Sequence, residues 1–576
     1  MLVDEDVFGF DVAVDDALAV GICKSIGELA AQPNRLAVRQ SPLRLDELSE
    51  RIPVDVLRDD VAPALVFAGV EDADDVRMLE ASHDARLTLE RSHCFGVDGF
   101  GERGVEEFDG DPSAEAKVLG EPDLSHAAST EQPFEAVSSV YDVRGGERQM
   151  TLQHLRTPER GAEAALLAGS FAVLLIGWRA LAAADFSLPG GMVRIVAQAA
   201  VCVIAMHACT RVLAPRARPE VLPSATLLAS LGIILVTRLA PGSAAQQANW
   251  LAVAALAYAA GLAAGLVPTR LRALTYTSGL LAVLTLVATG LFGETINGAR
   301  LWVRIAGQSV QTTEFIKALV VLFLAGYLSD AAGALVRQGG RLAAVSVRGT
   351  AYILPLTLVL AGAMAALALL RDLGSIALLL LLSVAMLYVS TGRVRFAAGG
   401  LALVLITGLF GYFAFDHVKG RVDAWLDPYS DPAGGGYQSL QATYAVNAGG
   451  ITGTGLGRGM PTVVPAASTD YVFAAAAEEL GLAGAAGILV LYATLLHSGL
   501  RVAAEGTDSF QRLLAAAIAL LIAIQAAVII AGNLRLIPTT GITLPFVSYG
   551  GSSLVVNFGL VGLLVGLSQS SRAERS

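Results

Sequence analysis

Residues 468–482 read STDYVFAAAAEELGL, and this stretch decides how the whole chain is interpreted. Asp470 closes a long polar segment, and the pair Glu478 and Glu479 opens an apolar one in which residues 480–500 contain no Asp, Glu, Lys or Arg. A carboxylate is therefore expected at the boundary between a membrane and water. Ionisable groups are costly in such places and commonly have a function.

The composition is that of a membrane protein. Of the 576 residues, 54% are hydrophobic and 16% are charged, and the mean hydropathy is +0.60. A soluble protein of this length is less apolar. The four cysteines have neither the CxxC spacing nor the Cys/His spacing of a metal site, so no metal site is predicted.

Three regions are predicted from the distribution of charge and apolar runs. Residues 1–150 hold 33 acidic and 13 basic side chains and no apolar run that could span a bilayer. We expect this region to be a small soluble domain, a disordered segment or an extension that is not native. Residues 151–220 are predicted to carry two transmembrane helices, and residues 221–576 the main membrane core.

Twelve segments have the length of about 20 apolar residues that a bilayer requires, which predicts an all-α, multi-pass membrane protein. Arginines gather in the short connections on one side of these spans, and the positive-inside rule assigns that side to the cytoplasm. Both termini are then cytoplasmic. The predicted spans are residues 162–184, 191–213, 221–241, 248–268, 272–292, 312–330, 350–370, 373–393, 395–415, 478–500, 511–532 and 545–568.

The connection at residues 416–477 is predicted to lie outside the cell, with Asp470 near its end. It is far longer than most connections, and such loops are commonly functional. Its sequence predicts turns followed by a short amphipathic helix at residues 437–448 and a glycine-rich coil at residues 449–459. The alternative is a solvated loop that only caps the helices.

Asp470 has two interpretations. It precedes a helical run, so it has the position of a helix N-cap or first-turn acid that the helix dipole stabilises. The residues alone favour this interpretation. The same position also suits a general base, because it holds a carboxylate at a rigid helix end.

Other charged and polar residues are candidates for substrate binding. Glu314 and Lys317 are spaced i, i+3 in an apolar span, where they either neutralise each other or line a cavity. Asp372 has the position of an N-cap, and Ser548 is expected inside the last span, where small residues either pack helices or contact substrate. Arginines predicted on the outer side contact lipid headgroups or grip a phosphate; they include Arg300, Arg304, Arg421 and Arg535.

Five ordered motifs resemble the SEDS family (shape, elongation, division and sporulation), whose members include FtsW, RodA and SpoVE. The most specific is PTTGITLPFVSYGGSS at residues 538–553, which is similar to the family's C-terminal signature. The resemblance covers residues 221–568 and implies a core of ten spans, with two more before it. The other motifs are STDYVFAAAAEELG, WLDPYSDPAGGGYQSLQA, QTTEFIKA and RDLGS.

The resemblance implies a peptidoglycan glycosyltransferase that polymerises lipid II at the outer face of the cytoplasmic membrane. The family's candidate catalytic aspartate falls on Asp470, and the Glu and Lys of another family motif fall on Glu314 and Lys317. Forming a β-1,4 bond from an α-linked pyrophosphate inverts the anomeric carbon in one displacement, so one base is enough. Charge on the pyrophosphate would be compensated by the outer arginines or by a divalent cation, Mg²⁺ or Mn²⁺.

The implied partners are lipid II, a class B penicillin-binding protein that cross-links the strands, and other proteins of the elongation or division machinery. No nucleic-acid partner is expected. Two alternatives remain open at this stage. One is a flippase for a lipid-linked precursor, and the other is a non-catalytic scaffold of a cell-wall synthesis complex.

Overall fold

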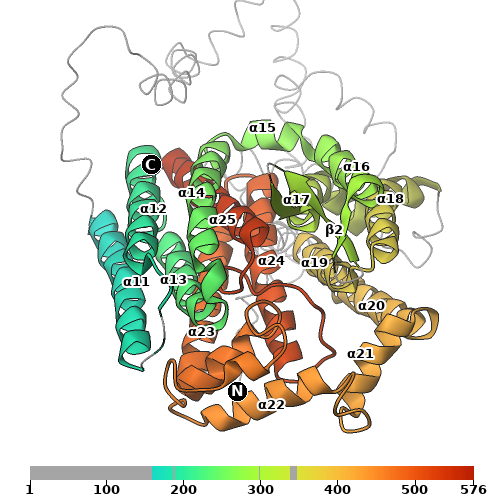
Figure 1. Ribbon diagram of the computed structural model, residues 1–576. Coiled ribbons are helices and arrows are strands. Elements are labelled where there is room, and N and C mark those ends of the chain that lie inside the picture. Colours follow the sequence, from blue (N-terminus) through green and yellow to red (C-terminus); the bar gives the residue numbers. More distant parts are fainter. Residues whose placement is uncertain are drawn as a thin grey trace, which may run out of the picture. The chain divides into compact units, whose positions relative to one another are not determined.

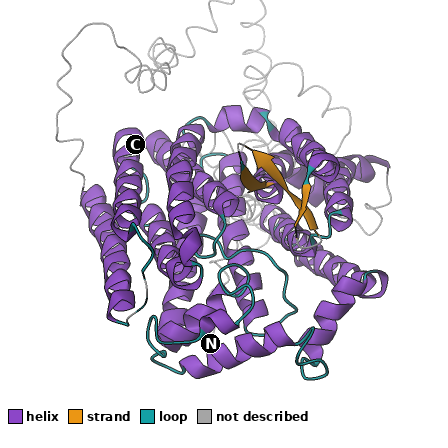
Figure 2. Cartoon of the chain, in the orientation of Figure 1, coloured by secondary structure: helices purple, strands orange, loops and turns teal. Residues whose placement is uncertain are grey.

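Long apolar helices make up most of the structure. The computed structural model describes residues 158–575 except 185, 187, 297–298, 306 and 338–346, so the predicted region at residues 1–150 lies outside the described residues. In the described part, eleven helices are long and apolar enough to cross a membrane. Helices suit this environment because lipid offers no partner for an unpaired backbone group. Figures 1 and 2 show these helices gathered into one bundle.

Each predicted span coincides with a helix. Eleven of the twelve predicted spans correspond to the long apolar helices. The remaining one, at residues 350–370, is α18 (Val347–Leu369), whose described apolar part, Pro355–Leu369, is shorter than those of the others. The eleven longer helices are α11 (Pro158–Ala183), α12 (Met192–Leu213), α13 (Val221–Leu239), α14 (Ala244–Gly265), α16 (Thr275–Phe292), α17 (Thr312–Arg337), α19 (Leu373–Thr391), α20 (Val394–Ala414), α23 (Val472–Ala504), α24 (Ser509–Asn533) and α25 (Gly551–Arg575). Short helices connect some of them: η4 (Pro241–Ser243), α15 (Pro268–Ala273), α21 (Asp416–Leu426), α22 (Tyr437–Gly449) and η6 (Pro461–Val463).

Two helices begin at other residues than the predicted spans. Helix α23 begins at Val472, as the helical run expected after Asp470 indicates, and so precedes the span predicted from residue 478, because the alanine-rich residues before the glutamate pair are strong helix formers. The last helix begins at Gly551 rather than at residue 545, because Pro545 lacks an N–H and Phe546 has a φ of 66°. Ser548 therefore precedes the last helix and does not lie inside it.

A small antiparallel sheet was not predicted. It consists of β1 (Glu294–Ile296), β2 (Ala299–Ile305) and β3 (Gln308–Gln311), in the order β1-β2-β3 between α16 and α17. Ile305 pairs with Gln308, so β2 and β3 are joined by a two-residue turn in which Gly307 has a φ of 80°. Apart from this sheet, the described residues form an all-α structure.

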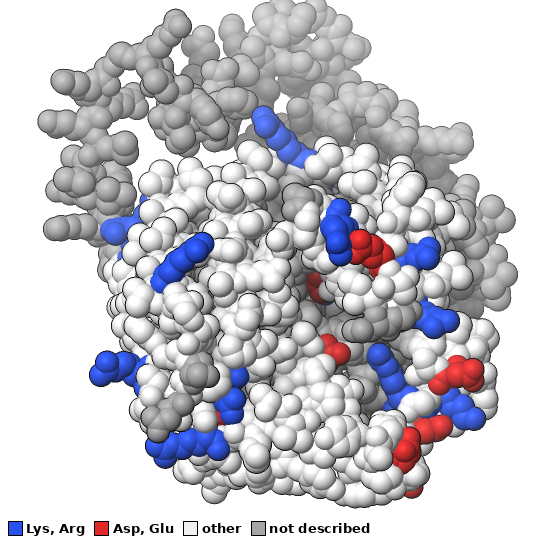
Figure 3. Space-filling model, in the orientation of Figure 1, with Lys and Arg blue, Asp and Glu red and all other residues white. Residues whose placement is uncertain are grey.

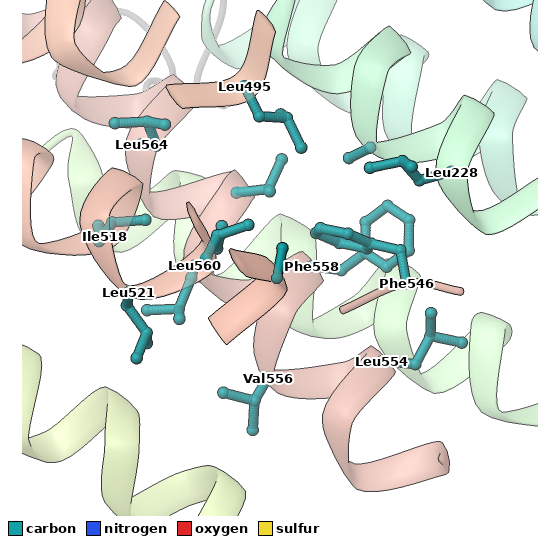
Figure 4. Packing of buried hydrophobic residues seen from close by; sticks show 14 of the residues in the cluster. Leu228, Leu495, Ile518, Leu521, Phe546, Leu554, Val556, Phe558, Leu560 and Leu564 are labelled. Atoms are coloured by element: carbon teal, nitrogen blue, oxygen red, sulfur yellow. The ribbon is translucent and has the colours of Figure 1, made fainter. Parts of the chain in front are cut away.

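The inner helices anchor the chain that follows α24. Most residues of α13, α24 and α25 are buried, whereas α20 is almost wholly exposed. Phe546 and Phe558 meet edge to face in this core, with ring centroids 5.1 Å apart (Figure 4). Phe546 belongs to the non-helical residues 534–550, so the core holds this segment in place.

One end of the bundle carries the long predicted loop. We call this end the loop face and define it as α21, α22, residues 450–471 and residues 534–550. The helix predicted at residues 437–448 is confirmed as α22, and α21 was not predicted. Figure 1 shows both helices at the bottom of the view, and Figure 3 shows acidic and basic side chains gathered over α21 on a mostly uncharged face.

Candidate active site

A pocket in the loop face contains Asp470. Its volume is about 260 Å³, and its walls come from α21, α22, the end of α24 and residues 539–542. Asp470 and Arg421 line it, whereas the other candidate site residues predicted from the sequence do not. The lining residues are His417, Gly420, Arg421, Ala424, Gly435, Gln438, Ser439, Asp470, Tyr471, Ile529, Gly532, Asn533, Thr539, Thr540, Gly541 and Ile542.

Backbone contacts hold the residues around Asp470. The Asn533 side chain donates to the carbonyl of Asp470 at 2.8 Å and accepts from the N–H of Ala474 at 3.0 Å. Ser548 donates through Oγ to the carbonyl of Thr469 at 2.5 Å. Buried Asn533 and Ser548 thus fix the chain on both sides of Asp470 from α24 and from residues 534–550.

The N-cap interpretation of Asp470 was wrong. The residue before the first turn of α23 is Tyr471, and no side chain caps the helix there. Asp470 lines the pocket and is half-buried. Burial raises the pKa of Asp470, while Arg421 and a hydrogen bond with Thr469 act in the opposite direction. A carboxylate with a raised pKa is a stronger proton acceptor than an ordinary one.

Arg421 is the arginine that shares the pocket with Asp470. Its Nη1 donates to the carbonyl of Thr539 at 3.3 Å, and the side chain is otherwise exposed. Gly541, with a φ of 73°, leaves room for it, because a Cβ there would lie 3.2 Å from Nη2. A guanidinium in this position has donors left for an anion that enters the pocket.

Arg535 has a structural contact instead. Its Nη2 donates to the carbonyl of Trp425 at 3.0 Å, and the indole Nε1 of Trp425 donates to the carbonyl of Arg535 at 2.9 Å. This reciprocal pair joins α21 to residues 534–550. Arg535 therefore supports the wall of the pocket from outside it.

Glu314 and Lys317 form a buried ion pair in α17. Lys317 Nζ lies 2.7 Å from Glu314 and donates to Gln525 of α24 at 3.0 Å. Gln525 in turn donates to the carbonyl of Thr543 at 2.7 Å. The pair is thus connected through one side chain to residues 534–550, although neither residue lines the pocket.

The remaining candidates lie elsewhere. Arg300 and Arg304 are exposed on β2, where Arg304 lies 3.2 Å from Glu294. Asp372 is the N-cap of α19, as predicted, and its carboxylate accepts from the N–H of Ser375 at 3.0 Å. Their proposed contacts with substrate stay predictions.

Three pocket residues were missed. Burial raises the pKa of Tyr471, while Ser439 of α22 and Thr539 act in the opposite direction. Its position directly after Asp470 was the available signal. Asn533 and His417 were missed because nothing in the sequence indicates that the end of α24 and the start of α21 meet at the pocket. Burial and the nearby charges of Arg371 and Arg421 lower the pKa of His417.

Known proteins resemble this chain over most of its described length. The FtsW, RodA and SpoVE family model, described as "Cell cycle protein", matches residues 221–573. "Peptidoglycan glycosyltransferase RodA" of Mycobacterium bovis is 37% identical over 379 residues, which cover 64% of this chain and 81% of that relative. "Stage V sporulation protein E" of Bacillus subtilis is 34% identical over 295 residues, covering 50% and 77%.

A solved structure has a similar fold. It is described as "Structural coordination of polymerization and crosslinking by a peptidoglycan synthase complex", and one of its chains matches with a TM-score of 0.50 and 27% identity. The match covers 62% of this chain and 98% of that one. The resemblance found in the sequence motifs is confirmed, and this multi-pass membrane protein belongs to the FtsW/RodA/SpoVE family of cell cycle proteins.

Proposed function

We propose that this protein is a peptidoglycan glycosyltransferase that polymerises lipid II, with Asp470 as its general base. The observation that carries the proposal is the pocket at the loop face that Asp470 and Arg421 line together. The similarity to relatives named peptidoglycan glycosyltransferases supports it. In this proposal the loop face lies outside the cytoplasmic membrane and both termini lie in the cytoplasm, as the arginine-rich short connections indicate.

The residues of the pocket divide the chemistry between them. Asp470 accepts the proton of the acceptor GlcNAc 4-hydroxyl as its oxygen attacks the anomeric carbon of the donor MurNAc. The bond from that carbon to the pyrophosphate breaks, and the pyrophosphate leaves with the electron pair. Arg421 compensates the charge on the leaving group, and the carbon is inverted in this single displacement.

A metal ion held by protein ligands does not fit the donor set. Among the described residues, no three His, Cys, Asp or Glu side chains gather as a metal site, and the pocket wall contributes one carboxylate. We therefore derive no step from Mg²⁺ or Mn²⁺. Charge compensation in the proposal comes from Arg421.

The proposed partner is a class B penicillin-binding protein, which would cross-link the glycan as it forms. The similar solved chain comes from a complex described by polymerisation and crosslinking, which supports this proposal. Other proteins of the elongation or division machinery are proposed to join them.

The test is polymerisation of labelled lipid II by the purified full chain, with and without its transpeptidase. We expect the wild type to make long glycan strands and Asp470→Asn to reduce the rate by about 10²- to 10⁴-fold, the usual contribution of a general base. Asp423→Asn is the matched control, because Asp423 is exposed on α21 outside the pocket. Equal product from wild type and Asp470→Asn would remove Asp470 from the mechanism, whereas no product from either protein, with or without the transpeptidase, would favour the scaffold.

A further inference from the structure

The helical segment that follows Asp470 is separated from the rest of α23. Gly481 has a φ of 67° and a ψ of −173°, which interrupts the helix between residues 472–480 and residues 482–504. Because of this break, the long second part of α23 does not dictate the direction of the short first part. Other contacts must fix it.

The glycine-rich coil, which the structure places after α22 at residues 450–460, makes several of these contacts. The N–H of Met460 donates to the carboxylate of Glu478 at 2.6 Å, and the N–H of Thr454 donates to its carbonyl at 2.9 Å. The N–H of Gly455 donates to the carbonyl of Glu479 at 3.0 Å. The end of the first part of α23 is therefore enclosed by the coil.

Arg238, near the end of α13, joins this segment to the coil. Its Nε donates to the carboxylate of Glu479 at 2.8 Å, and its Nη2 donates to the carbonyl of Gly459 at 2.8 Å. Both charged side chains are buried, with relative exposures of 10% and 1%. A planar guanidinium fixes the two acceptors relative to each other, which a lysine cannot do in the same way.

Phe186, which follows α11, contacts the side chain of Arg238. The guanidinium carbon of Arg238 lies 5.2 Å from the ring centroid of Phe186, within the range of a cation–π contact. Close by, Gly457 of the coil packs against the end of α11, because a Cβ at Gly457 would lie 2.9 Å from Ala184. Phe186 and α11 precede residue 221, where the family match begins, so a helix outside the matched residues contacts this coil.

We propose that Arg238, held by Phe186, is a positioning residue for Asp470. Glu479 is nine residues from Asp470, which corresponds to about 13 Å along a helix, so Arg238 acts through Glu479 and does not touch the substrate. It sets the direction of residues 472–480 and thereby the place of the carboxylate in the pocket. The inference rests on the proposed function of Asp470.

The experiment measures kcat and KM for lipid II polymerisation by the folded full chain. Arg238→Gln should lower kcat by about tenfold to a hundredfold, the usual result of a small misplacement of a reacting group, with KM changed less than threefold. Arg238→Lys should lose less, because it keeps a charge beside Glu479. Arg458→Gln is the matched control, since Arg458 is exposed on the same coil.

A second variant distinguishes a loss of positioning from a failure to fold. Arg238→Gln leaves the Glu479 carboxylate buried without its partner, so the double variant Arg238→Gln, Glu479→Gln removes both charges and should show the same loss of kcat. If folded Arg238→Gln kept a kcat within threefold of wild type, the proposal would be overturned, even if its melting temperature were lower. A loss found in KM alone would overturn it as well. If Asp470→Asn kept full activity, the proposed role of Asp470 as general base would fail, and that result is separate from these.

Discussion

Burial raises the pKa of Asp470, and this makes the proposed reaction dependent on pH. The base works only when it is deprotonated, so kcat/KM should fall as the pH falls through this raised pKa. We expect the acid limb of the profile to lie above the ordinary aspartate value of about 3.9.

Arg421 lowers the pKa of Asp470, so its removal should shift that limb. In Arg421→Gln the carboxylate loses a nearby positive charge, its pKa rises further, and the acid limb moves to higher pH. Arg300→Gln is the control, because Arg300 is exposed on β2 and does not line the pocket. A pH–rate profile of each variant checks the prediction, and an unchanged limb in Arg421→Gln would contradict it.

At single positions the sequence predicted the residue types of the site better than their partners. It identified Asp470 and Arg421 among several candidates, but spacing alone cannot tell which of the outer arginines meets the carboxylate. Arg535 is two residues beyond α24, yet its guanidinium contacts the carbonyl of Trp425. Asn533 was missed because its role consists of contacts with backbone that only the folded chain brings together.

Among the elements, the break in α23 requires a glycine. The φ and ψ of Gly481 belong to a region that is essentially restricted to glycine, and a Cβ there would lie 2.2 Å from the N of Gly453. Gly481→Ala should therefore destabilise the protein by about 3 kcal/mol or more and reduce polymerisation. Thermal unfolding of the purified protein measures the first effect.

The control for this prediction lies in the same helix. Gly487 is exposed, and a Cβ added there would have no neighbouring atom within 4 Å, so Gly487→Ala should be neutral or more stable by about 0.5–1 kcal/mol. Similar losses in Gly481→Ala and Gly487→Ala would contradict the prediction, because they would show that the break at Gly481 has no special need for glycine.

The elements that were predicted well are those that a single property defines. Spans follow from hydropathy over about 20 residues, and each coincides with a helix. The sheet between α16 and α17 and the non-helical residues 534–550 depend on contacts between distant parts of the chain. Gln311 of β3, for example, donates through its N–H to Ser552 of α25 at 2.9 Å, a pairing that no local pattern reveals.

For the molecule as a whole, close packing of α14 against α25 connects the bundle to the site. A Cβ at Gly261 would lie 2.0 Å from the carbonyl oxygen of Gly559, so the two backbones approach directly. Small residues favour such contacts in a membrane, where packing rather than the hydrophobic effect drives helix association. At the loop face α14 also holds residues 534–550, because the Tyr549 hydroxyl donates to the side-chain oxygen of Gln246 at 2.8 Å.

This packing predicts opposite results for two glycines on one helix. A Cβ at Gly562 would lie 2.1 Å from the carbonyl oxygen of Tyr258, and backbone cannot move aside cheaply, whereas the nearest atom to a Cβ at Gly559 is 3.7 Å away. Gly562→Ala should cost about 1–3 kcal/mol of stability, the usual range for overpacking, and Gly559→Ala should be tolerated. Melting temperatures of the two purified variants provide the comparison. Equal melting temperatures for the two variants would contradict the close approach of α14 and α25. Because α25 follows directly from residues 534–550, Gly562→Ala should also lower polymerisation of lipid II.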